Sequence, residues 1–175
     1  MDALDGGDGE IIEYDGLRVQ VVRDGEGNTI AANVYVPGTD PDSPAYSGGI
    51  STWSTNVASI NADNLDTLEE STAMMQLVDR ALSDAGISSD VPVNLGGFSQ
   101  GAATVSALST NKEFVKKYKL NYLYMQGGPT GDMKVSPNIP TMIVADRNDP
   151  VPHLQGSSTY PDRGKNVRTI ETNYD

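Results

Sequence analysis

A serine lies between two glycines in the stretch NLGGFSQGAAT, where Gly97, Ser99 and Gly101 form a G-x-S-x-G motif. This spacing can expose a nucleophilic hydroxyl at a strained turn from a strand into a helix, and its neighbours must be small for the turn to close. We expect Gly96 to relieve crowding together with these two glycines. The apolar run VPVNL precedes the motif and the small residues AATVSALS follow it. This context favours a nucleophile, although a serine that only caps the helix fits the same residues.

Backbone N–H groups near Ser99 could stabilise the negative charge that develops on an attacked carbonyl oxygen. The N–H of Gln100 would lie at a helix N-terminus, where the helix dipole adds to the effect. A second N–H is expected from the loop after an earlier strand, and the stretch VYVPGT ends there with Gly38 and Thr39. Gln100 and Thr39 are therefore the predicted oxyanion-hole residues, with an ordinary Pro-Gly turn as the alternative at Thr39.

A carboxylate is expected on a loop after a later strand, because functional groups gather at the carboxyl ends of parallel strands. Asp149 follows the predicted strand 139–146 and lies two parallel strands downstream of the serine. It is our candidate for the acid of a catalytic triad, with a plain Asp-Pro turn as the alternative. Asp146 ends the same strand and is expected to be structural.

The sequence contains one histidine, His153, four residues after Asp149. A serine nucleophile needs an imidazole that takes its proton and returns it to the leaving group. A histidine so close to its own acid would need an unusual loop to reach Ser99. We therefore expect His153 to line the rim of the site or to be exposed, and its use as the base remains an alternative.

The stretches VYVPGT, GFSQGAA and DPVPHLQG, in this order, resemble the α/β-hydrolase superfamily in its esterase- and lipase-like branch. The sequence looks most similar to lipase-like serine hydrolases of actinobacteria, over residues 29–172. The resemblance implies a hydrolase that cleaves a small-molecule or lipid ester and requires no metal or organic cofactor. Esterases, lipases, thioesterases and peptidases share the motif, so it does not define the acyl or alcohol group.

The base histidine of that superfamily follows the final strand, and the last predicted strand here is NVRTIET, residues 166–172. The resemblance therefore implies a base just beyond Asp175 and a chain truncated at its C-terminus. A non-catalytic binding module on the same fold, lacking a catalytic histidine, is the competing hypothesis.

Composition excludes several other functions. The chain has no cysteine, which rules out disulfides and thiolate chemistry, and a single histidine rules out a histidine-rich metal site. A formal net charge of −12 disfavours nucleic-acid partners. The acidic N-terminus does not resemble a signal peptide, and no apolar run approaches the roughly 20 residues of a membrane span. The compartment, cytoplasmic or secreted, and the oligomeric state stay open.

Hydrophobic patterning predicts the α/β class. After a disordered lead-in at 1–9, strands at 17–24 and 29–38 form a hairpin around a Gly/Asn turn. A helix over 67–85 ends at Gly86, a second helix spans 102–109, and strands fall at 91–98, 120–128, 139–146 and 166–172. We expect one domain over 10–175, with a mostly parallel sheet and helices on both faces. Segment 40–66, carrying Tyr46 and Trp53, could form an acyl-pocket wall, a lid or a surface loop.

Overall fold

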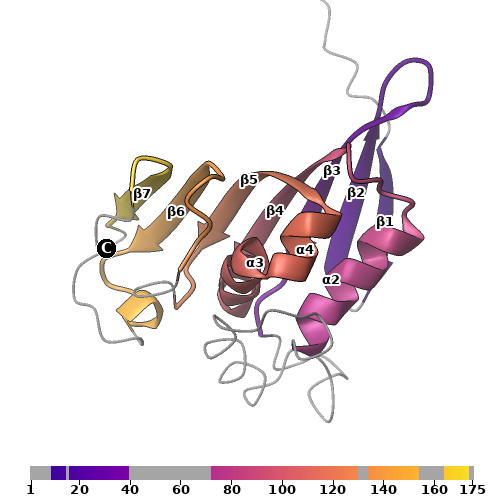
Figure 1. Cartoon of the computed structure of the whole chain (residues 1–175). Coiled ribbons are helices and arrows are strands. Elements are labelled where there is room, and N and C mark those ends of the chain that lie inside the picture. The colour runs from indigo at the N-terminus through magenta and orange to yellow at the C-terminus, as the bar shows by residue number, and fades with distance from the viewer. Residues whose placement is uncertain (1–8, 15, 40–71, 130–133, 154–163, 174–175) are drawn as a thin grey trace, which may run out of the picture.

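A single sheet organises the computed structural model, which describes residues 9–14, 16–39, 72–129, 134–153 and 164–173. Within these residues seven strands lie side by side in the order in which they occur in the sequence (Figure 1). The first three pair antiparallel and the following pairs are all parallel. The strands are β1 (Glu10–Tyr14), β2 (Leu17–Arg23), β3 (Thr29–Val36), β4 (Pro92–Phe98), β5 (Lys119–Gln126), β6 (Thr141–Asp146) and β7 (Val167–Thr172). The predicted α/β class, with an N-terminal hairpin and a mostly parallel sheet, is confirmed.

The hairpin turn between β2 and β3 is held by Asp24. Its carboxylate accepts hydrogen bonds from the backbone N–H groups of Glu26 (2.9 Å) and Asn28 (2.8 Å). Gly27 adopts φ +86°, a conformation that glycine reaches without a steric penalty. The Gly/Asn signal in the sequence therefore marks a real turn.

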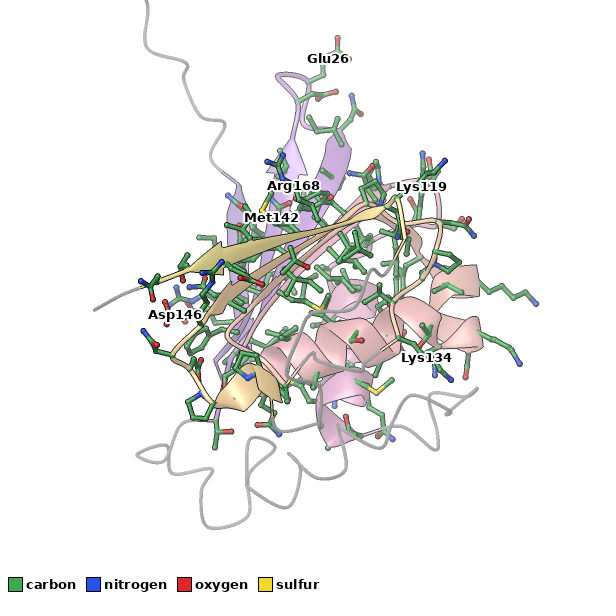
Figure 2. The ribbon with its side chains drawn as sticks, turned by 90° about the vertical axis from the view of Figure 1, so that its left-hand side faces the viewer. Glu26, Lys119, Lys134, Met142, Asp146 and Arg168 are labelled. Carbon is green, nitrogen blue, oxygen red and sulfur yellow. The ribbon has the colours of Figure 1, made fainter. Side chains whose placement is uncertain are left out.

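The three described α-helices lie on one face of the sheet (Figures 1 and 2). They are α2 (Ala73–Asp84), α3 (Gln100–Thr110) and α4 (Lys112–Lys117). Parallel strands are joined by right-handed crossovers in almost all proteins. A sheet that advances by one strand at a time in one direction therefore places its crossover helices on the same face. The expectation of helices on both faces is met on one face only within the described part of the chain.

The core lies between the sheet and these helices, and β4 shows the alternation that creates it. Val93 and Leu95 are fully buried toward the helices, whereas Asn94 and Gly96 point to the opposite face and are half-buried. Helix α3 packs against β3, β4 and β5, and nearly all its residues are buried. This explains its small side chains, because a helix in close contact on several sides has little room for large ones.

Local signals predict the end of α2 but not its start, since the helix expected over 67–85 begins only at Ala73. Thr72 caps its start by accepting a hydrogen bond from Met75 N–H at 3.3 Å. Gly86, at φ +67°, follows its end, and Ile87 N–H bonds back to Leu82 O at 3.0 Å, as expected of a glycine stop.

Strand β1 and helix α4 are not among the predicted elements. Within the described residues, none of the helices has the length and apolar character to cross a membrane.

Candidate active site

Ser99 occupies the turn between β4 and α3 in a strained backbone conformation. Its dihedral angles are φ 51° and ψ −117°, and it is the one non-glycine residue with positive φ in the described part of the chain. Its N–H donates to Gln126 O at 2.9 Å, which fixes the turn to β5. Its side chain makes no capping hydrogen bond with α3. The alternative that Ser99 only caps the helix is therefore not supported by its geometry.

Two glycines make this turn possible. A Cβ at Gly97 would overlap Gly101 O and lie 2.6 Å from Ala102 N, and a Cβ at Gly101 would overlap Val36 O. Both contacts are with backbone, which cannot move aside cheaply. A Cβ at Gly96 would meet only ordinary contacts, with Tyr35 Cδ1 at 3.5 Å as the nearest atom. The expectation that Gly96 also relieves crowding is therefore wrong, because this residue faces the open side of the sheet.

The predicted oxyanion residues, Thr39 and Gln100, are in contact. The Thr39 hydroxyl donates to Gln100 Oε1 at 3.1 Å, and the Gln100 side chain is buried. Gln100 is the first residue of α3, where backbone N–H groups have no partner inside the helix. Gly38, the residue before Thr39, lies against the turn at Ser99, since its Cβ position would be 3.1 Å from Ser99 Cβ. The loop after β3 thus lies directly against the serine.

Asp149 lies in the loop after β6, at the same edge of the sheet as Ser99. Its Oδ1 accepts from Val151 N–H at 2.9 Å, so this oxygen holds the loop after β6. A Cβ at Gly127, which has φ +57°, would lie 3.6 Å from Asp149 Oδ2 and 3.5 Å from Phe98 Cε2. Gly127 directly follows Gln126, the residue bonded to Ser99. Both are ordinary contacts, so the positive φ is what favours glycine here, and the Asp149 carboxylate lies close to the residue that follows Gln126.

Asp146 has the structural role expected of it. Its Oδ1 accepts from Asn148 N–H at 2.9 Å and its Oδ2 accepts from the Thr172 hydroxyl at 2.9 Å. Asn148 Nδ2 also donates to Asn173 Oδ1 at 3.3 Å. Figure 2 shows Asp146 near the tip of β7, at the far end of the sheet from Lys119. These hydrogen bonds thus tie the loop after β6, which carries Asp149 and is called the acid loop below, to the end of β7.

Several predicted residues lie wholly or partly outside the described part of the chain. His153 ends the short 3-10 turn Val151–His153 after Asp149, but its side chain is outside the described residues. Tyr46 and Trp53, with the whole of 40–66, also lie outside them. No group of three or more histidine, cysteine, aspartate or glutamate side chains suited to a metal occurs within the described residues.

Sequence reasoning missed Phe98 and Gly127. Phe98 is 57% exposed beside the serine, and with Pro37, Tyr124 and Gln126 it lines a hollow of about 360 Å³ on the open face. The glycine pair that ends LNYLYMQGG is the one sequence signal at Gly127, and by itself it indicates only the end of a strand. The approach of Gly127 to Asp149 joins segments that are far apart in the sequence.

Comparison with known proteins gives remote matches. No protein-family model and no curated protein matches the sequence. Among solved structures it is similar to a fungal lipase–inhibitor complex, with 16% identity over 85% of this chain and 62% of that one, at a TM-score of 0.42. A Rhizomucor miehei lipase propeptide complex has 17% identity over 83% of this chain and 50% of that one, at a TM-score of 0.39. A poly(3-hydroxybutyrate) depolymerase from Bordetella parapertussis has 14% identity over 94% of this chain and 84% of that one, at a TM-score of 0.43. The chain thus spans between half and two thirds of the length of the two lipases.

Proposed function

We propose that the protein is a serine hydrolase that cleaves carboxylic esters of small molecules or lipids. Ser99 is the nucleophile, and the N–H groups of Gln100 and Thr39 stabilise the oxyanion. Asp149 orients a histidine that follows residue 175. The carboxyl ends of β3, β4 and β6 contribute these residues, as parallel strands do when they bring loops to one edge.

The strained backbone of Ser99 is the observation that carries the proposal. A non-glycine residue at φ 51° and ψ −117° costs about 1–3 kcal/mol, and such strain persists where the surrounding structure enforces it. A helix cap needs no such conformation, and the Ser99 side chain makes no cap bond. The cost is accounted for if the turn serves to present a reactive hydroxyl to substrate.

The position of the acid loop supports a base that arrives after β7. Asn173 follows that strand and is bonded to Asn148, next to Asp149. A chain that continues from Asn173 would start beside the loop that carries Asp149. Strands β4 and β6 are two spacings apart, about 10 Å, which leaves room for an imidazole between serine and acid.

The proposed reaction has two steps. The Ser99 hydroxyl attacks the ester carbonyl while the imidazole takes its proton, and the tetrahedral oxyanion is held by the two N–H groups. The C–O bond to the alcohol then breaks as the imidazolium protonates the leaving oxygen. Water, deprotonated by the imidazole, attacks the acyl-enzyme. The acid is released and the Ser99 hydroxyl is restored.

Hydrolysis of a p-nitrophenyl ester by the full-length protein tests these roles. Ser99→Ala and Asp149→Asn should each lower kcat by about 10³-fold or more, since the triad acts as a unit. His153→Ala should leave kcat unchanged. An inactive full-length protein would favour the non-catalytic binding module, and loss of activity in His153→Ala would make His153 the base.

A further inference from the structure

The sheet face opposite the helices carries a row of side-chain amides that crosses four strands. Asn121 on β5 donates to Asn94 at 2.9 Å, Asn94 donates to Asn33 at 2.8 Å, and Asn33 donates to Gln20 at 3.1 Å. No described helix covers this face (Figure 2). We call these four residues the amide row.

The amide row leaves much of its hydrogen-bonding capacity unused. A carboxamide offers two N–H donors and an oxygen with two lone pairs. Within the described residues, Asn94 and Asn33 each use one donor and one lone pair, and the Asn121 oxygen accepts no side-chain bond. Because every bond in the row points the same way, each amide polarises the next and strengthens the groups that remain.

A hollow of about 430 Å³ opens beside the amide row and is lined by three of its members, Asn33, Asn94 and Asn121. Three tyrosines, Tyr35, Tyr122 and Tyr124, form its walls, and Gly96 leaves its floor open between two of them. Tyr35 is 51% exposed. The hydroxyl of Tyr124 donates to Gln126 at 2.9 Å, whereas those of Tyr35 and Tyr122 have no partner among the described residues. The hollow therefore combines aromatic faces with free hydroxyls and amides.

Charge limits what this hollow can bind. None of its lining residues is an aspartate, glutamate, lysine, arginine or histidine. They are amides, tyrosines, two aliphatic residues and a glycine. The chain carries a formal charge of −12, which repels anionic ligands, anionic membranes and a second copy of the same chain. An uncharged ligand is favoured.

We propose that this hollow, which Asn33, Asn94 and Asn121 of the amide row line, binds a neutral carbohydrate. A sugar ring has apolar C–H faces that stack on aromatic rings, and hydroxyls that both donate and accept. The amides and the two free tyrosine hydroxyls match both requirements. The hollow adjoins the one that Phe98 lines beside Ser99 and shares Tyr35, Gly96 and Tyr124 with it, but this inference does not depend on Ser99 being a nucleophile.

Affinity electrophoresis tests the proposal with the protein in native gels that contain hydroxyethyl cellulose, galactomannan or soluble starch. At least one of these neutral polysaccharides should retard the wild-type protein, and polygalacturonate should not. Tyr35→Ala and Gly96→Val should abolish the retardation. The second variant fills the hollow, and its new Cβ meets only ordinary contacts.

Ile30→Ala is the matched control, because Ile30 is also on β3 and is 49% exposed but lies outside the hollow. It should be retarded like the wild type, and circular dichroism should show all three variants folded. The proposal is overturned if none of the three neutral gels retards the wild type, or if folded Tyr35→Ala and Gly96→Val are both retarded as before. A dimer in gel filtration that Tyr35→Ala dissociates would instead identify a protein interface and also overturn it.

Discussion

The hydroxyl of Thr39 donates a hydrogen bond to the side-chain oxygen of Gln100 across 3.1 Å, joining residues 61 positions apart. It connects the loop after β3 to the first residue of α3. In the proposed mechanism both residues contribute their backbone N–H groups to the oxyanion hole. The side-chain bond then holds in place two backbone donors that must converge on one oxygen.

Removing that bond should slow ester hydrolysis by the full-length protein. We expect Thr39→Val to lower kcat by about fivefold, since a net hydrogen bond contributes roughly 1 kcal/mol and the backbone N–H remains. Thr39→Ser keeps the hydroxyl and should retain most of the rate. Equal rates for the valine and serine variants, measured with a p-nitrophenyl ester, would show that the bond does not position the loop.

Gly97 and Gly101, the two glycines at the Ser99 turn, should tolerate an added Cβ far less well than their neighbour Gly96. Gly97→Ala should lower the free energy of unfolding by about 1–3 kcal/mol, because its Cβ would overlap the Gly101 backbone. Gly96→Ala meets only ordinary contacts and should change stability by less than about 1 kcal/mol. Urea denaturation of the two variants checks this difference, and similar losses in both would contradict it.

The strain at Ser99 predicts an unusual order of stability. Ser99→Gly should be more stable than Ser99→Ala by about 1 kcal/mol, because glycine adopts φ 51° freely and alanine does not. The loss of chain entropy on ordering a glycine reduces the gain but should not cancel it. Thermal unfolding of the pair would reject stored strain if the alanine variant melts at the same or a higher temperature.

A cluster between α2 and α4 predicts how stability depends on pH. Burial raises the pKa of Tyr118 above 10.0. Burial opposes the charged form of Lys117, but hydrogen bonds with Asp79 and Tyr118 outweigh it and raise the pKa of Lys117 above 10.5. Lys117 Nζ lies 2.6 Å from Asp79 Oδ1. Groups with raised pKa values stabilise the fold below their unfolded values, and this contribution disappears as pH rises through their folded values.

We therefore expect the free energy of unfolding to fall between pH 9 and pH 12. Tyr118→Phe combined with Lys117→Met should be less stable at pH 8 and should lose less stability over that alkaline range. Urea denaturation at several pH values measures both slopes, with Lys116→Met on the same helix as the control. A double variant with the wild-type slope would mean that other groups cause the alkaline loss.

The immediate surroundings of Ser99 are predictable from sequence because their signals are local. Alternation of Val93 and Leu95 marks the strand, the glycines mark the turn, and small residues mark the helix. The acid loop follows from the same logic, because the carboxyl ends of parallel strands share one edge.

Contacts between distant segments are not predictable in this way. The Thr39–Gln100 bond and the approach of Asp149 to Gly127 depend on which strands are neighbours. The sequential strand order also determines that the described helices share one face, and no local pattern encodes that order. The amide row is not predictable for the same reason, since its members lie on four different strands.

Covalent labelling of the full-length protein with a fluorophosphonate probe tests the central claim most directly. The probe phosphonylates an activated serine, and mass spectrometry of the digested protein identifies the residue that carries it. We predict one labelled peptide, modified at Ser99, and no labelling in Ser99→Ala. Labelling of Ser99→Ala at the wild-type level, or modification at another serine, would contradict the assignment of Ser99 as the nucleophile.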